Sequence, residues 1–150
     1  MILYFWVVAQ IYKTILLVDD DQDDQLLFTE ALNEADAAVL CLTAMNGIDA
    51  LEKLNSGFAL MPNLVFMDVN MPRMNGIDCL KKIQQSAVLK DIPVVMYSTS
   101  CSPAYQKECF DNGAVHYMEK PNDFAQLCNS LKRIVTHGIP QVKTTCNDTL

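Results

Sequence analysis

Short apolar runs alternate with segments of helical periodicity along most of this chain, and this alternation restricts the possible folds more than any other feature. Three of the runs, at residues 15–18, 64–67 and 94–97, are continuously apolar. Such runs are typical of strands that are buried on both faces. Strands that alternate with helices form a parallel sheet with helices packed on both sides. The pattern therefore predicts an α/β domain.

Five strand–helix units fit the residues from Lys13 onward. Strands are expected at about 14–19, 38–43, 63–68, 93–98 and 115–118. Helices are expected at about 23–35, 46–56, 75–86, 103–112 and 122–136. The second strand is assigned by its place in the alternation, because residues 37–42 also have a helical propensity.

The length and composition suit one domain of this kind. The chain has 150 residues, of which 51% are hydrophobic, enough for a sizeable core. We expect the domain at 13–136, preceded by an apolar extension at 1–12 and followed by a polar tail at 137–150. No second folded unit, and hence no output domain, is expected.

Charge and cysteine usage narrow the classes of function. The net charge of -7 argues against a nucleic-acid partner, because binding to phosphates requires clustered Lys and Arg side chains. The six cysteines show neither a CxxC pair nor zinc-type spacing. We therefore predict reduced thiols in a cytoplasmic protein.

The extension at 1–12 has three possible interpretations. It lacks the basic region and the cleavage pattern of a signal peptide. It is also shorter than the roughly 20 residues that cross a bilayer as a helix. A segment outside the domain core is favoured, and an extra strand or oligomer contact and a membrane anchor stay open.

Polar side chains stand where four of the predicted strands end. Asp19 and Asp20 end the first strand, Asp68 ends the third, Ser98 ends the fourth, and Lys120 follows the fifth. In an open parallel sheet, ligands bind outside the carboxyl ends of the strands. Converging carboxylates repel one another unless a cation such as Mg2+ neutralises them, and one carboxylate could then act as a nucleophile. The sequence thus predicts a site for a divalent cation and a phosphoryl group.

Two other interpretations of the acidic stretch 19–24 are weaker. A solvated loop that caps the next helix accounts for Asp23 and Asp24, but not for Asp19 and Asp20. A calcium loop of the EF-hand type would need glycine at the position of Asp24 and a helix before the loop.

Several segments, taken together and in order, resemble the receiver domain of bacterial two-component response regulators, similar to single-domain chemotaxis regulators. The resemblance covers residues 13–136. The segments that carry it are Leu17-Val18-Asp19-Asp20, Asp68-Val69-Asn70-Met71-Pro72, Met74-Asn75-Gly76, Ile92-Pro93-Val94-Val95-Met96-Tyr97-Ser98, Gly113-Ala114, Tyr117 and Lys120-Pro121. The resemblance implies a flavodoxin-like doubly wound (βα)5 fold, a three-layer sandwich whose five-stranded parallel sheet has the order 2-1-3-4-5.

The resemblance also implies roles in phosphoryl transfer. Asp68 would be the phosphoacceptor and Lys120 would pair with a phosphoryl oxygen. Ser98 would be the switch hydroxyl, and the rotamer of Tyr117 would follow its movement.

A metal site is implied as well. Asp20, Asp68 and the backbone carbonyl of Asn70 would bind Mg2+ directly, and Asp19 would act through a metal-bound water.

Two positions near the switch, Ser98 and the Lys120–Pro121 bond, each have an alternative. Thr99 is an alternative to Ser98, but Ser98 keeps the family's spacing to Lys120, and a slip of one residue in a strand would aim the side chain at the opposite face. The Lys120–Pro121 bond is a candidate for the cis form, which would aim the lysine inward.

The implied function is signalling. A histidine kinase or a histidine phosphotransfer protein would phosphorylate Asp68, and a downstream protein would bind the face formed by 103–112, 115–118 and 122–136. The chain would be a cytoplasmic monomer or weak dimer without membrane or nucleic-acid partners. It would not be an enzyme, apart from its own phosphoryl transfer and slow autodephosphorylation.

Two other functions of related architecture fit less well. A phosphatase of the haloacid dehalogenase type would need a second acid two residues after Asp68, where Asn70 stands. A flavodoxin-like FMN carrier would need a phosphate-binding loop after the first strand, where the acids would repel the phosphate.

Overall fold

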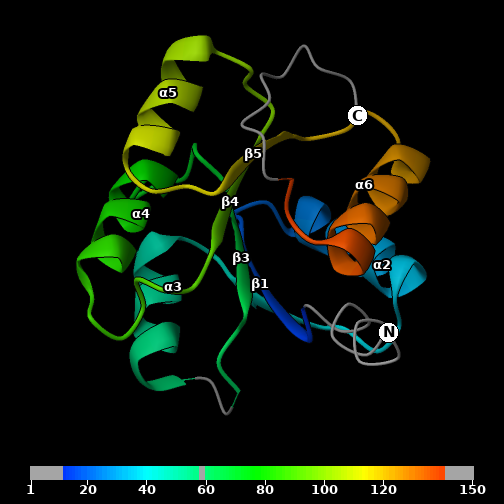
Figure 1. Ribbon diagram of the computed structural model, residues 1–150, viewed down its shortest axis with the longest axis horizontal. Helices are drawn as coiled ribbons and strands as arrows, with labels where there is room; N and C mark the ends of the chain where they lie inside the picture. The colour runs from blue at the N-terminus through cyan, green and yellow to red at the C-terminus, as the bar shows by residue number, and fades with distance from the viewer. Residues whose placement is uncertain (1–11, 58–59, 141–150) are drawn as a thin grey trace, which may run out of the picture.

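A five-stranded parallel sheet lies at the centre of the molecule between two layers of helices (Figure 1). The computed structural model describes residues 12–57 and 60–140. The strands are β1 (Thr14–Val18), β2 (Leu40–Ala44), β3 (Leu64–Met67), β4 (Val94–Ser98) and β5 (His116–Glu119). The helices are α2 (Gln22–Ala35), α3 (Gly47–Glu52), α4 (Gly76–Gln85), α5 (Pro103–Asp111) and α6 (Phe124–His137), and a π-helical turn (Lys53–Gly57) follows α3.

The strands pair in the order β2-β1-β3-β4-β5, and every pair is parallel. Both the predicted fold class and the predicted strand order are therefore confirmed. The direction of winding reverses between β1 and β3, and in such sheets the crevice at the reversal is the usual ligand site. Asp19 and Asp68 directly follow these two strands.

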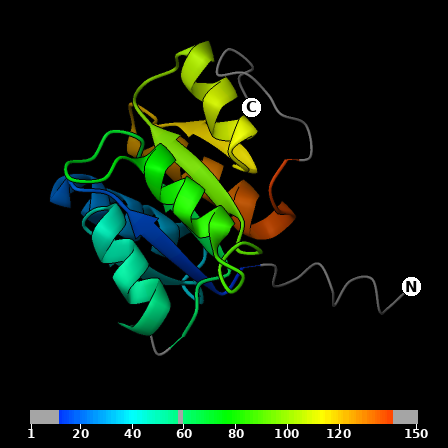
Figure 2. The same ribbon diagram turned by 90° about the vertical axis from the view of Figure 1, so that its left-hand side faces the viewer.

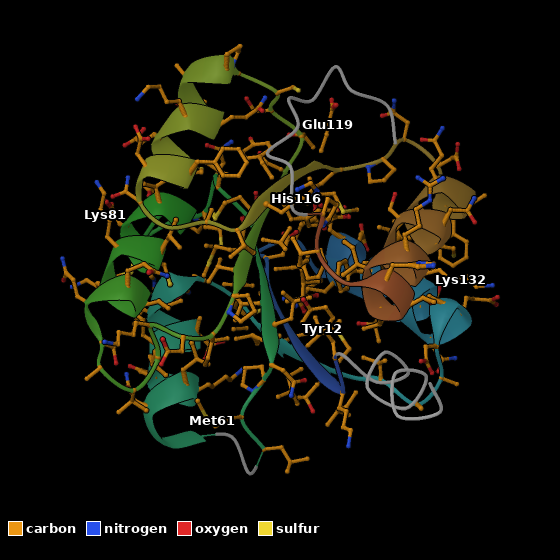
Figure 3. All side chains as sticks on the ribbon, in the orientation of Figure 1. Tyr12, Met61, Lys81, His116, Glu119 and Lys132 are labelled. Carbon is orange, nitrogen blue, oxygen red and sulfur yellow. The ribbon has the colours of Figure 1, made fainter. Side chains whose placement is uncertain are left out.

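The two faces of the sheet bury different side chains. Between the sheet and α2 and α6, Phe28, Phe66 and Tyr97 pack edge to face, with ring centroids 5.0 to 6.0 Å apart. The opposite face, covered by α3, α4 and α5, is mainly aliphatic (Figure 2). Side chains fill both layers, and Lys81 on α4 and Lys132 on α6 lie on opposite outer surfaces (Figure 3).

Side-chain caps explain where most helices begin. Asp21 accepts hydrogen bonds from the backbone N–H groups of Asp23 and Asp24 at the start of α2, which satisfies donors that have no partner within the helix. Asn46, Asn75 and Asp123 do the same for α3, α4 and α6. In α5 a proline occupies the first turn instead.

Most predicted boundaries lie within two residues of those in the structure, and three of the differences have an identifiable cause. The second strand starts at Leu40 rather than 38, because Asp36 accepts the backbone N–H groups of Ala38 and Val39 and forms a turn there. The second helix changes to a π-helical turn from Lys53, which the spacing of the apolar residues Ile48, Leu51 and Leu54 in the sequence could not reveal. The last helix continues through His137 and ends at Gly138, whose positive φ of 83° favours glycine.

Cysteine chemistry also departs in part from the prediction. Cys41, Cys79, Cys109 and Cys128 are free, whereas Cys101 is disulfide-bonded. The prediction of reduced thiols is therefore wrong at Cys101, since sequence spacing does not show which cysteines approach each other in space.

Across the parts of the chain that the structure describes, no helix is long and apolar enough to cross a membrane. The apolar extension predicted at 1–12 lies outside these residues except for Tyr12, which packs against the core layer beside α2 and α6.

Candidate functional site

Two neighbouring strands position the central acids. The Asp68 N–H donates to the Val18 carbonyl at 2.9 Å, and the Asp19 N–H donates to the Ala44 carbonyl at 3.1 Å, so the sheet's hydrogen bonding extends one residue past each strand. Asp19 is fully buried, Asp68 is 7% exposed, and the neighbouring Asp20 is exposed. Oxygen atoms of these three carboxylates lie within 4.8 Å of one another. The predicted convergence of Asp19, Asp20 and Asp68 is present in the structure.

Lys120 reaches this acidic group from the end of β5. Its Nζ lies 2.7 Å from Asp19 Oδ2, 2.8 Å from Asp24 Oδ2 and 3.5 Å from Asp68 Oδ2. Its backbone N–H donates to the Ser98 carbonyl at 2.8 Å, which fixes the strand end beside β4. One cation is therefore shared by three carboxylates.

The Lys120–Pro121 bond is not cis, and the same holds for every peptide bond in 12–57 and 60–140. The prediction of a possible cis bond was wrong. The lysine points inward without it, because its backbone hydrogen bond and the acids already hold it in place.

Burial and charge shift the pKa values in the site. Burial raises the pKa of Asp68 to about 6, and the nearby Asp19 adds to this, whereas Lys120 opposes it. Burial also raises the pKa of Asp19 against the opposing effect of its hydrogen bond with Lys120. For Lys120, burial alone would lower the pKa, but the hydrogen bonds with Asp19 and Asp24 and the charge of Asp68 raise it above its ordinary value. The ammonium is therefore charged at neutral pH.

The loop after Asp68 is held close to the acceptor by a glycine. The Gly76 N–H donates to the Val69 carbonyl at 2.8 Å, and a Cβ atom at Gly76 would lie 2.0 Å from the Asp68 carbonyl oxygen. Only glycine permits this approach. Asn70, the predicted carbonyl ligand, is exposed, and its N–H donates to Asp68 Oδ1 at 3.3 Å.

Ser98 and Tyr117 are linked beside the site. Ser98 is buried at the end of β4, whereas Thr99 is exposed, so the two hydroxyls lie in different environments. The Ser98 Oγ accepts the Ser100 N–H at 3.2 Å, and the Tyr117 hydroxyl donates to the Ser100 carbonyl at 2.6 Å. Burial raises the pKa of Tyr117, and a hydrogen bond with Ser98 opposes that shift. The switch roles of Ser98 and Tyr117 stay predictions.

Two residues of the site, Asp24 and Tyr97, were not predicted from the sequence. Asp24 was interpreted only as a helix-capping acid, yet it contacts Lys120. The ring centroid of Tyr97 lies 5.2 Å from Lys120 Nζ, a cation–π distance. Tyr97 could have been found, because it pairs with Met118 in the sheet and Lys120 follows two residues later on the same face.

The sequence is similar to those of known response regulators. A family profile described as "Response regulator receiver domain" matches residues 15–132. Two-component response regulator ORR6 of Oryza sativa subsp. japonica is 32% identical over 127 residues, covering 83% of this chain and 74% of the relative. Two-component response regulator ARR17 of Arabidopsis thaliana is 35% identical over 116 residues, covering 71% of this chain and 74% of the relative.

Solved structures of response regulators have a similar fold. The phosphorylated cyanobacterial phytochrome response regulator RcpA has a TM-score of 0.75 at 29% identity, covering 83% of this chain and 94% of that one. The Mn(2+)-bound form of response regulator Rcp1 has a TM-score of 0.74 at 27% identity, covering 89% and 98%. Chemotaxis response regulator CheY4 of Vibrio cholerae has a TM-score of 0.69 at 29% identity, covering 81% and 97%.

The relatives differ in their organisms and in their lengths. They include plant as well as bacterial proteins, so the predicted bacterial origin stays a prediction. A protein-glutamate methylesterase of Methanococcus maripaludis is matched over 34% of its own length, which leaves most of that enzyme outside the match.

The family match itself spans most of the residues predicted to form the domain, and the chain belongs to the response regulator receiver domain family.

Proposed function

We propose that Asp68 is a phosphoacceptor that takes a phosphoryl group from a histidine kinase or a histidine phosphotransfer protein. Receiver domains of two-component response regulators are signalling domains that interact with such proteins. The observation that carries the proposal is the position of Asp68, nearly buried, 3.5 Å from Lys120 and in one cluster with Asp19 and Asp20.

The acid cluster fits Mg2+, which prefers carboxylate, carbonyl and phosphate oxygens. Both oxygens of Asp19 accept hydrogen bonds, from Lys120 at 2.7 Å and from the Asp21 N–H at 3.0 Å, and these bonds are shorter than those that Asp68 accepts from Lys120 at 3.5 Å and from the Asn70 N–H at 3.3 Å. This supports an indirect role for Asp19, through water. Asp20, Asp68 and the Asn70 carbonyl would then be the direct ligands. The bound cation would offset negative charge on the transferring phosphoryl group.

The covalent step requires Asp68 to be ionised. One oxygen of its carboxylate attacks the phosphorus and forms the new P–O bond, while the P–N bond of the phosphohistidine breaks. The electron pair returns to the imidazole nitrogen, which takes a proton from solvent. Lys120, already 3.5 Å from Asp68, would pair with an oxygen of the transferred group.

Phosphorylation would then change the contacts around Ser98. The modification adds about -1.5 to -2 of charge, which is large in a partly buried site. A movement of the Ser98 hydroxyl toward the phosphoryl group would break its contacts with Ser100 and Tyr117. The loop before α5 and the side chain of Tyr117 on β5 would then change position. We propose that a downstream protein binds the face formed by α5, β5 and α6. A cytoplasmic monomer or weak dimer fits this role.

The direct test is incubation with acetyl phosphate and Mg2+, followed by intact mass spectrometry. The wild type is expected to gain about 80 Da, the mass of one phosphoryl group, and Asp68→Asn is expected to gain none. Asp91→Asn removes an exposed carboxylate at the opposite end of the sheet and is expected to behave like the wild type. No adduct on the wild type, or an undiminished adduct on Asp68→Asn, would overturn the proposal.

A further inference from the structure

Asp24 shares the site lysine with the central acids, although it comes from a helix. Its carboxylate lies 2.8 Å from Lys120 Nζ, which is closer than the 3.5 Å between the same nitrogen and Asp68. Asp24 stands in the first turn of α2, where its backbone N–H is held by the Asp21 side chain at 3.2 Å. The helix therefore fixes the position from which Asp24 reaches the lysine.

The partners of Lys120 differ in their access to water. The side chain of Asp19 is fully buried and that of Asp68 is 10% exposed, whereas that of Asp24 is 34% exposed. Bulk solvent can reach Asp24 if the lysine leaves, but it does not reach Asp19. Since an ammonium group has three N–H donors, a new acceptor near Asp68 can be accommodated by giving up the Asp24 contact.

We propose that Asp24 is a positioning residue that holds Lys120 in the unphosphorylated state and releases it when Asp68 is modified. This inference rests on the proposed function, because it concerns the same lysine and the same acceptor. Asp24 competes with the phosphoryl oxygens for the ammonium group. Its removal therefore favours the modified state.

The expected size of the effect follows from the exposure of the pair. Ion pairs that are partly open to water contribute little, so the loss of Asp24 is expected to strengthen binding of a phosphoryl mimic by about two- to fivefold. Asp24→Glu keeps a carboxylate in reach and is expected to stay near the wild type.

The test measures the affinity for beryllofluoride by calorimetry at saturating Mg2+, with the full chain. Asp24→Asn is compared with Asp23→Asn, which removes an equal charge from the same exposed helix turn without contacting the lysine. We expect tighter binding for Asp24→Asn and no more than about a 1.5-fold change for Asp23→Asn. Equal effects of the two substitutions would overturn the inference, because they would show a general effect of charge.

A second comparison separates positioning from a structural role. In a Lys120→Gln background, Asp24→Asn is expected to lose its effect, because no ammonium group remains to be held. An unchanged effect in that background would contradict the inference. If the wild type itself fails to bind beryllofluoride with Mg2+, the proposed phosphoacceptor function fails instead, so the two failures are distinguishable.

Discussion

The acidic cluster and the aromatic layer beneath it share strand β3 but have opposite effects on folding. Phe66 and Asp68 are two residues apart on β3 and its end, and both are nearly or fully buried. Burial of Phe66 against Phe28 and Tyr97 stabilises the fold, whereas burial of Asp68 beside Asp19 opposes ionisation. The site is therefore built directly beside a fully buried part of the sheet. That packing can hold charged groups in an arrangement that is unfavourable by itself.

The largest expected effect lies in the aromatic layer. Phe66→Ala should lower the free energy of unfolding by about 3 to 5 kcal/mol, because it removes a fully buried ring and leaves a cavity. Urea unfolding followed by circular dichroism measures this loss. Val88→Ala is the control, since Val88 is 79% exposed and its truncation should change stability by less than about 0.5 kcal/mol. A loss below about 1 kcal/mol for Phe66→Ala would mean that the aromatic layer does not anchor the site.

The second-largest expected effect is a rise in the free energy of unfolding when Asp68 is replaced, and its size depends on pH. Because the folded-state pKa of Asp68 is raised to about 6, its protonated form favours folding. That stabilisation is present below the unfolded pKa of about 4 and is lost as pH rises through about 6. Asp68→Asn should therefore raise the free energy of unfolding by about 1 to 3 kcal/mol at about pH 7.5 and change it little at about pH 4.

Urea unfolding of both proteins at the two pH values provides the measurement. Asp91→Asn, which replaces an exposed acid away from the site, serves as the control. Its effect on the free energy of unfolding should change little between the two pH values. A destabilised Asp68→Asn at neutral pH would show that the contact with Lys120 outweighs the burial of the carboxylate.

The smallest expected effect is stabilisation of the folded state by Mg2+. It tests whether a bound cation offsets the unfavourable burial of the carboxylates in the acidic cluster. At a Mg2+ concentration about ten times the dissociation constant, binding to the folded state adds about 1.4 kcal/mol of stability. The resulting rise in melting temperature should be larger at about pH 7.5 than at about pH 5, because the carboxylates must be ionised to bind the metal. Removal of Mg2+ with EDTA should reverse it. An equal rise in Asp68→Asn would place the cation elsewhere.

Much of the fold could be predicted because its signals are local. Continuous apolar runs such as 15–18 and 64–67 identify strands buried on both faces. Gly113 lies two residues after the end of α5, and Gly138 directly follows α6. The weakest prediction concerned β2, an edge strand whose outer residues are partly exposed. Its apolar pattern is correspondingly incomplete, and a turn formed by Asp36 shortened it.

The site was predictable to the extent that its residues come directly after strands. Asp19, Asp68 and Lys120 stand at strand ends, and parallel strands bring their carboxyl ends to one edge. Asp24 has no such signal. It is separated from Lys120 by 96 positions, and only the packing of α2 against the sheet and α6 determines that the two side chains meet.

The alternation of strands and helices and the chemical groups at the strand ends follow from residue order alone, because both depend on periodicity over a few neighbouring residues. The packed fold is needed to see how one ammonium group is divided among Asp19, Asp24 and Asp68, and how far each carboxylate is removed from water. Burial and ion pairing depend on distances between segments far apart in the chain, and residue order does not specify those distances.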